Sequence, residues 1–180
     1  MHISLRSALT LDELSEHWMN CNIIMIGGPD YNKIARALEH LCPIEYKGGE
    51  NVWLRNRNTG KEYVPVFIGR GERAHVQDYG FFAKTSLAGM GSRKLVFLGG
   101  ARTWGVLGAA KLVACEPPGR GKTGSEAQVK LLVQKLGSDP SFLVPVGVIG
   151  NKINGIVKQE FYLDQMEPLN HVNADADAHA

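Results

Sequence analysis

The chain has 180 residues, of which 44% are apolar and 21% charged, so it can bury a sizeable core and is neither disordered nor fibrous. Its formal net charge of +2 comes from scattered basic residues, which excludes the basic patch of a protein that binds duplex nucleic acid or an anionic membrane. The apolar runs are too short to span a bilayer, and residues 1–20 carry no export signal. We therefore expect a cytoplasmic protein.

The cysteines and histidines predict no metal site. Cys21, Cys42 and Cys115 are widely spaced and form no CxxC pair, which also argues against a disulfide framework. The six histidines are dispersed, and no two of them have metal-ligand spacing. The sequence identifies no cofactor.

The N-terminal part predicts a helix and then a unit of strand, glycine turn and helix. A capping-box pattern starts a helix over residues 10–19. Residues 22–26 are an isoleucine-rich run, typical of a strand that is buried on both faces of a parallel sheet. After Gly27-Gly28-Pro29, residues 30–41 carry apolar side chains at helical spacing.

The middle of the chain predicts strands followed by a second unit of the same kind. Residues 51–57 and 62–68 form a β-hairpin in this interpretation, and residues 76–83 form another strand. The apolar run 94–98 then ends in a double glycine and is followed by a helix over residues 103–114. This arrangement repeats the strand, glycine turn and helix of the N-terminal part.

The C-terminal part predicts a helix over residues 126–136 and a hairpin of strands 141–149 and 156–163. Residues 170–180 are small, polar and acidic, and we expect them to be disordered. Residues 1–169 then form a single α/β domain. The economical architecture is a three-layer Rossmann-like sandwich, with a partly parallel central sheet and antiparallel hairpin additions.

The first glycine turn is a candidate binding site for a phosphate-bearing ligand. Gly27 and Gly28 follow a strand and allow backbone N–H groups to approach a ligand closely. Asp30 can cap the next helix, and Asn32 can reach a base or a sugar hydroxyl. The structural alternative is a tight turn in which Asp30 acts only as a cap.

The second glycine turn is a candidate of the same kind. Gly99 and Gly100 precede Thr103, a good N-cap residue, and Arg102 is placed to pair with an anion. In the structural alternative, the glycines of the following helix serve close packing alone and Arg102 is solvated.

The two turns become one site if their strands are neighbours. Ligands of open α/β sheets bind beyond the carboxyl ends of the strands. In this interpretation Gly100 faces the ligand, and Gly100→Val is predicted to abolish binding while the protein stays folded.

Two carboxylates are candidates for catalysis. Asp78 and Glu126 can orient ribose hydroxyls or stabilise the oxocarbenium-like transition state of glycosidic cleavage. The structural alternatives are a strand-end residue for Asp78 and a first-turn helix residue for Glu126.

Three segments together carry a family resemblance. Ile-Gly-Gly-Pro-Asp-Tyr-Asn begins at Ile26, Asp-Tyr-Gly begins at Asp78, and Leu-Gly-Gly-x-x-Thr-x-Gly-x-x-x-Ala begins at Leu98. This pattern resembles small Rossmann-like modules of bacterial conflict and nucleotide-signalling systems, such as the nucleoside deoxyribosyltransferase-like and lysine-decarboxylase-like nucleotide-binding groups. The resemblance covers residues 23–136 and implies a nucleotide ligand. Gly124-Ser125-Glu126 departs from the Gly-Thr-x-x-Glu helix start of the transferase-like group, so no reaction is transferred.

Three functions are consistent with the sequence. The first is binding or sensing of a nucleotide-like, phosphate-bearing ligand at the two glycine turns. The second is an enzyme that cleaves an N-glycosidic bond of a nucleotide or related cofactor. The third is a protein-interaction module without a small ligand, in which a homo-oligomer or a larger protein is the partner.

Overall fold

The computed structural model describes residues 22–71, 74–86, 94–114, 134, 141–151, 153, 155–162 and 167–168. The predicted helix over residues 10–19 and the predicted tail 170–180 lie outside these residues, as does the helix over 126–136 apart from residue 134. No helix in the described ranges is long and apolar enough to cross a membrane.

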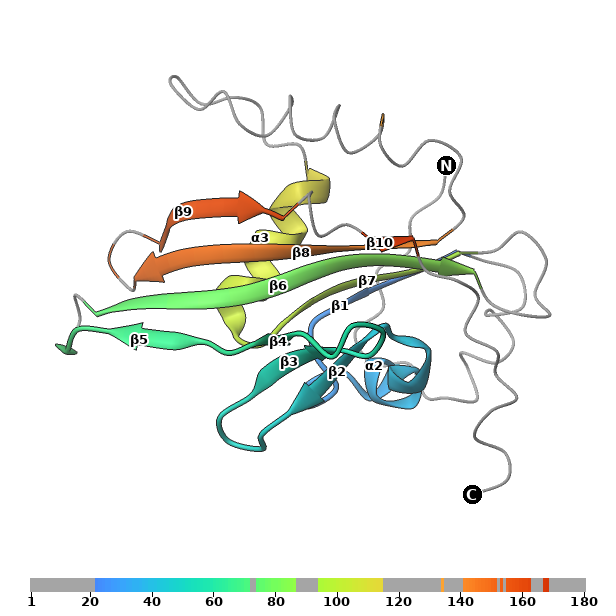
Figure 1. The fold of residues 1–180 in the computed structure, drawn as a ribbon, viewed down its shortest axis with the longest axis horizontal. Helices are drawn as coiled ribbons and strands as arrows, with labels where there is room; N and C mark the ends of the chain where they lie inside the picture. The colour runs from blue at the N-terminus through green and yellow to red at the C-terminus, as the bar shows by residue number, and fades with distance from the viewer. Residues whose placement is uncertain are drawn as a thin grey trace.

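The described part of the chain alternates short helices with many strands (Figure 1). In order along the chain these elements are β1 (Ile23–Ile26), α2 (Lys33–Ala37), the 3-10 helix η1 (Glu39–Leu41), β2 (Ile44–Lys47), β3 (Trp53–Asn56), β4 (Glu62–Tyr63), β5 (Val66–Ile68), β6 (His75–Ser86), β7 (Lys94–Gly100), α3 (Thr103–Ala114), β8 (Phe142–Asn151), β9 (Gly155–Phe161) and β10 (Glu167–Pro168).

The strands form one large mixed sheet and one small antiparallel sheet. The large sheet has seven strands in the order β1-β7-β6-β8-β10, with β5 beside β6 and β9 beside β8. Its β1 and β7 are parallel, whereas the other pairings in it are antiparallel. The small sheet has the order β2-β3-β4. The predicted mixed α/β class with a partly parallel sheet is therefore confirmed.

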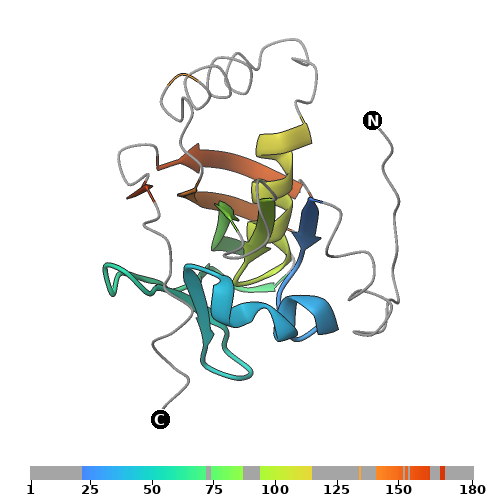
Figure 2. The ribbon, with the colours of Figure 1, turned by 90° about the vertical axis from the view of Figure 1, so that its right-hand side faces the viewer.

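The large sheet is covered on both faces. Helix α3 contacts β6, β7 and β8 on one face, while α2 and the small sheet lie on the other (Figure 2). The helical content is low, because a three-stranded sheet occupies much of the second covering layer. A Rossmann-like sandwich has helices in both covering layers, so the structure establishes only the coarser α/β class.

Strand β6 shows how the sequence builds the two faces. Successive side chains of a strand point to opposite faces, so Phe81 and Ala83 enter the core on the α2 side while Asp78 and Gly80 face α3. The core on the α2 side also takes in Ile44 and Leu54 from the small sheet. The small sheet therefore supplies buried apolar surface to the same core as the large sheet.

Helix α3 lies directly on the backbone of the sheet. A Cβ atom at Gly80 would collide with the backbone carbonyl of Gly105, and one at Gly105 would collide with the carbonyl of Tyr79. At Gly108, an added Cβ would instead meet a side-chain methyl group of Val148. Gly105 and Gly108 therefore allow α3 to pack closely on the sheet.

The environment of β1 differs from the prediction. Met25 is buried, but Ile24 and Ile26 are 57% and 54% exposed, so the expected burial on both faces is wrong. The reason is topological, because β1 is an edge strand with β7 as its neighbour among the described strands. The helix predicted over 30–41 is also shorter, since it begins at Lys33 and gives way to η1.

The predicted hairpins are only partly right. The hairpin β3–β4 and the hairpin β8–β9 are both present. However, the second strand of the first hairpin ends early: β5 leaves the small sheet and pairs with β6 of the large one. Strand β2 was not predicted.

Candidate functional site

The two glycine turns lie side by side. Strands β1 and β7 are parallel neighbours in register, with Ile26 opposite Leu98, so their carboxyl ends meet at one edge of the fold. The N–H of Gly27 donates to the carbonyl of Leu98 at 3.0 Å and ties the first turn to strand β7. The sequence left open whether the two strands are neighbours, and the structure shows that they are.

The first turn depends on its glycines. Gly27 has φ of +97°, a left-handed conformation that favours glycine, and no atom lies within 4 Å of where its Cβ would be. At Gly28, an added Cβ would lie 3.0 Å from Cε1 of Tyr46. Gly27 therefore sets the direction of the turn, and Gly28 allows the turn to rest on the Tyr46 ring.

Asn32 caps helix α2. Its Oδ1 accepts hydrogen bonds from the N–H groups of Ile34 at 3.0 Å and Ala35 at 3.1 Å, and its Nδ2 donates to the carbonyl of Ile26 at 3.4 Å. The cap is therefore Asn32 and not Asp30. Its amide oxygen is thus used in the cap, whereas Nδ2 makes one of its two possible hydrogen bonds within the turn.

Asp78 caps helix α3 from the neighbouring strand. The side chain is fully buried, and its carboxylate accepts from the N–H of Gly105 at 2.5 Å and of Tyr79 at 2.8 Å. Burial raises the pKa of Asp78, although these N–H groups and that of Arg102 oppose the rise. The residue is thus an internal cap without exposed surface, and the structure does not support the predicted catalytic role.

Gly99 and Gly100, predicted as a second glycine turn, are instead the last two residues of strand β7, and they face protein, not solvent. A Cβ on Gly100 would lie 2.5 Å from the backbone carbon of Gly105, and one on Gly99 would collide with the ring of Phe81. We therefore expect Gly100→Val to lose stability, in contrast to the folded variant without ligand binding that the sequence predicts. A side chain at this position would have to displace α3 from the sheet.

Arg102 and Thr103 stand at the start of α3. The guanidinium carbon of Arg102 lies 4.8 Å from the centroid of the Phe67 ring, and its Nη2 is 3.5 Å from Oδ1 of Asn51. Its Nε is buried and has no partner among the described residues. Thr103 is exposed, and the capping acceptor for this helix is Asp78. Neither residue lines the cavity described next.

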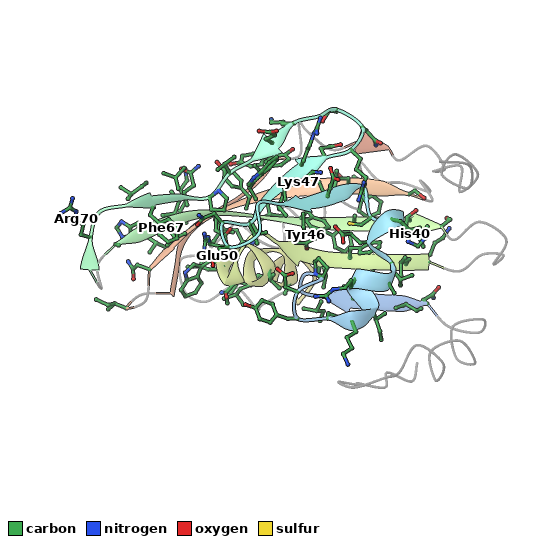
Figure 3. All side chains as sticks on the ribbon, turned by 90° about the horizontal axis from the view of Figure 1, so that it is seen from below. His40, Tyr46, Lys47, Glu50, Phe67 and Arg70 are labelled. Atoms are coloured by element: carbon green, nitrogen blue, oxygen red, sulfur yellow. The ribbon has the colours of Figure 1, made fainter. Side chains whose placement is uncertain are left out.

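A cavity of about 270 Å³ opens beside the first glycine turn. Its wall combines that turn, the α2–η1 segment and the β2–β3 hairpin, through Pro29, Asp30, Arg36, Glu39, Tyr46, Lys47, Gly48, Gly49 and Val52. Figure 3 labels Tyr46 and Lys47 on the hairpin side of this wall. Within the described residues, the N–H groups of Asp30 and Gly49 have no acceptor. The residues that line the cavity therefore include two with unpaired N–H groups, two with cationic side chains and two with carboxylates.

Tyr46 connects the cavity to both glycine turns. Its ring lines the cavity, while its hydroxyl lies beneath the turns, where a Cβ on Gly28 or Gly99 would touch it. Burial raises the pKa of Tyr46. Its hydroxyl has no hydrogen-bond partner among the described residues, although the nearby Gly100 backbone acts to lower the pKa.

We expect Tyr46→Phe to leave the free energy of unfolding unchanged or to raise it by about 1 kcal/mol. A buried hydroxyl without a partner carries a desolvation cost that phenylalanine avoids, and the ring contacts with Phe81 are kept. Urea denaturation of both proteins measures the difference. A loss of more than about 1 kcal/mol would show that the hydroxyl has a partner in solution.

Several residues of the cavity were not predicted from the sequence. Arg36 and Glu39 are three positions apart in a segment predicted as one helix, and that spacing places them on one side. Tyr46 and Lys47 were missed because β2 was not predicted. Glu126, the second predicted catalytic residue, lies outside the described residues.

Comparison with known proteins adds no family or fold relative: no family model, curated protein or solved structure matches the chain. Over the described ranges there is also no group of three or more His, Cys, Asp or Glu residues that could hold a metal ion.

Proposed function

We propose that this chain binds a small, nucleotide-like ligand that carries a phosphate, and that the ligand occupies the cavity beside the first glycine turn. The observation that carries the proposal is the composition of the cavity wall. It joins two cationic side chains, Arg36 and Lys47, to free backbone N–H groups at Asp30 and Gly49. Phosphate oxygens accept from donors of both kinds.

The cations are held in place by the protein. Nε of Arg36 donates to the carbonyl of Pro29 at 3.1 Å, which anchors the guanidinium to the turn and leaves its terminal nitrogens for an anion. Nζ of Lys47 lies 2.7 Å from a carboxylate oxygen of Glu45 on the same strand. Arg36 is thus the first phosphate contact in this proposal, with Lys47 as a second charge nearby.

The size and charge of the cavity favour a mononucleotide over a nucleoside polyphosphate. A volume of about 270 Å³ is at the low end of small-molecule sites. The carboxylates of Asp30 and Glu39 balance the charges of Arg36 and Lys47, and they can accept hydrogen bonds from ribose hydroxyls or an exocyclic amine. The Tyr46 ring offers an apolar surface to the base or sugar.

We expect a nucleoside monophosphate to raise the melting temperature of the protein, and the free nucleoside to do so much less. A ligand at a hundredfold excess over its Kd adds about 2.7 kcal/mol of stability. Arg36→Gln is expected to weaken the monophosphate about tenfold or more, because a charged hydrogen bond to phosphate is lost. Thermal melts confirmed by calorimetric titration measure both effects.

Arg55→Gln is the matched control, since Arg55 is also exposed but does not line the cavity. It should bind as the unmodified chain does. If no mononucleotide shifts the melting temperature, or if Arg36→Gln and Arg55→Gln bind equally, this cavity is not the site.

A second candidate function is cleavage of the N-glycosidic bond of such a ligand. The observation in its favour is that two carboxylates, Asp30 and Glu39, line one cavity, whereas Asp78 is buried away from it. Chromatography of the same incubations for free base separates cleavage from binding. If base is released, Glu39→Gln and Asp30→Asn identify the carboxylate that is required.

The proposal extends to the type of module and to its location in the cell. A nucleotide ligand agrees with the resemblance to small Rossmann-like nucleotide-binding modules, and with a cytoplasmic location, where nucleotides are abundant.

A further inference from the structure

Arg102 connects three elements that are distant in the chain. It directly precedes α3, its guanidinium carbon lies 4.8 Å from the centroid of the Phe67 ring on β5, and its Nη2 lies 3.5 Å from Oδ1 of Asn51. Asn51 belongs to the loop of residues 48–52, which joins β2 to β3. Figure 3 labels Phe67 and, next to Asn51 in the chain, Glu50. Arg102 therefore joins the start of α3 both to β5 and to this loop.

Loop 48–52 forms one side of the ligand cavity. Gly49 and Val52 line the cavity, and Asn51 stands between them in the chain. Gly48 and Gly49 have φ of +93° and +56°, and a glycine backbone can readily adopt other conformations. A contact that fixes Asn51 therefore also fixes the N–H of Gly49, which is one of the proposed phosphate donors.

The Arg102 side chain is well placed to make that contact. Its backbone is anchored at the sheet, because its N–H bonds to the Asp78 carboxylate and its carbonyl accepts from the N–H of Val106 at 3.2 Å. The Phe67 ring attracts the guanidinium and restricts its position. Since Nε is buried without a partner among the described residues, Asn51 is the side chain's hydrogen-bond acceptor in that part of the protein.

We propose that Arg102 is a positioning residue for the ligand cavity: through Asn51 it holds loop 48–52, and with it the N–H of Gly49. Its effect on ligand affinity rests on the proposed function, whereas its effect on the loop does not. Arg102 does not line the cavity, so it acts on a ligand only through the loop. By reciprocity, a phosphate bound to the Gly49 N–H favours the loop conformation that Arg102 holds.

The 15N relaxation of the unliganded protein tests the effect on the loop. The backbone order parameters of Gly49 and Asn51 should be about 0.8 in the unmodified chain and below about 0.6 in Arg102→Gln. Asn51→Ala should have the same effect, and the double variant should add nothing, because both changes remove one contact. Arg55→Gln is the matched control, since it also removes the charge of an arginine, on the strand β3 that follows this loop. It should leave both order parameters unchanged.

Asn51→Asp tests the same contact in the opposite direction. A carboxylate accepts a stronger, charge-assisted hydrogen bond from a guanidinium than an amide oxygen does. The order parameters of the loop should therefore be at least as high in Asn51→Asp as in the unmodified chain. In the Arg102→Gln background, Asn51→Asp should not restore them, because the cation is missing.

Calorimetric titration with a nucleoside monophosphate tests the effect on the cavity. Arg102→Gln should bind it about two- to fivefold more weakly, and Arg55→Gln should bind it as the unmodified chain does. If no mononucleotide binds, the ligand proposal fails, and the relaxation data alone decide the role of Arg102 in the loop. Unchanged order parameters in folded Arg102→Gln and Asn51→Ala overturn the inference. So does an unchanged affinity in a variant whose loop has become more mobile.

Discussion

Gly105→Ala is expected to lower the free energy of unfolding by about 2 to 3 kcal/mol, despite the better helix propensity of alanine. The added methyl group would collide with the carbonyl of Tyr79 and would lie 2.6 Å from its carbon. Both atoms belong to the backbone of β6, which cannot turn aside as a side chain can. The first turn of α3 must therefore lift away from the sheet. Urea denaturation monitored by circular dichroism measures the loss.

Two other changes in α3 serve as comparisons. Gly108→Ala meets a methyl group of Val148, which can rotate, so its cost should be smaller than that of Gly105→Ala. Leu107→Ala lies on the exposed side of the helix and should cost less than about 1 kcal/mol. If all three variants were equally stable, the close approach of α3 to the backbone would not hold in solution.

Asp78→Ala is expected to cost about 2 to 4 kcal/mol, because it leaves the buried N–H groups of Tyr79 and Gly105 without their acceptor. Asp78→Asn keeps one acceptor oxygen and should cost about 1 kcal/mol. If nucleotide binding or turnover is established, folded Asp78→Asn should retain it. Loss of turnover in a folded variant that still binds would restore the catalytic role predicted from the sequence.

The stability difference between the unmodified protein and Asp78→Asn is also expected to depend on pH. Because burial raises the pKa of Asp78, the folded protein holds this proton to a higher pH than the unfolded chain does. The stabilising effect of protonation is fully present below the ordinary pKa of 3.8 and is lost as the pH rises through the raised value. As the pH falls from about 7 to about 4, the free energy of unfolding of the unmodified protein should therefore rise relative to that of Asp78→Asn. A difference that does not vary with pH would contradict the raised pKa.

The fold was predictable where the sequence pattern is local. The helix over 103–114 and the β8–β9 hairpin follow from periodicity and turn residues within a few positions. The edge position of β1 and the transfer of β5 to the large sheet depend on pairings with distant strands. No local pattern around residues 22–26 or 66–68 records those pairings.

The site was predicted at the level of turns but not of side chains. The pairing of β1 with β7 brings the two glycine pairs together, but Gly99 and Gly100 belong to strand β7 and form no turn. The structure gives Asn32 and Asp78 another role than the one predicted from the sequence, for a common physical reason. Each side chain accepts hydrogen bonds from N–H groups at the start of a helix, which the sequence had suggested were available to a ligand. A polar residue beside a helix start is a candidate internal cap before it is a ligand contact.

The pairing of β1 with β7 also has a consequence for synthesis of the protein on the ribosome. The two strands are about seventy residues apart in the chain, so the edge that carries both glycine turns is a non-local structure. Strand β1 and the first turn leave the ribosome early, but β1 cannot pair until β7 has left the exit tunnel. Meanwhile the β2–β3–β4 meander, whose contacts are local, can already form. We therefore expect the nascent chain to acquire its small sheet before the β1–β7 edge.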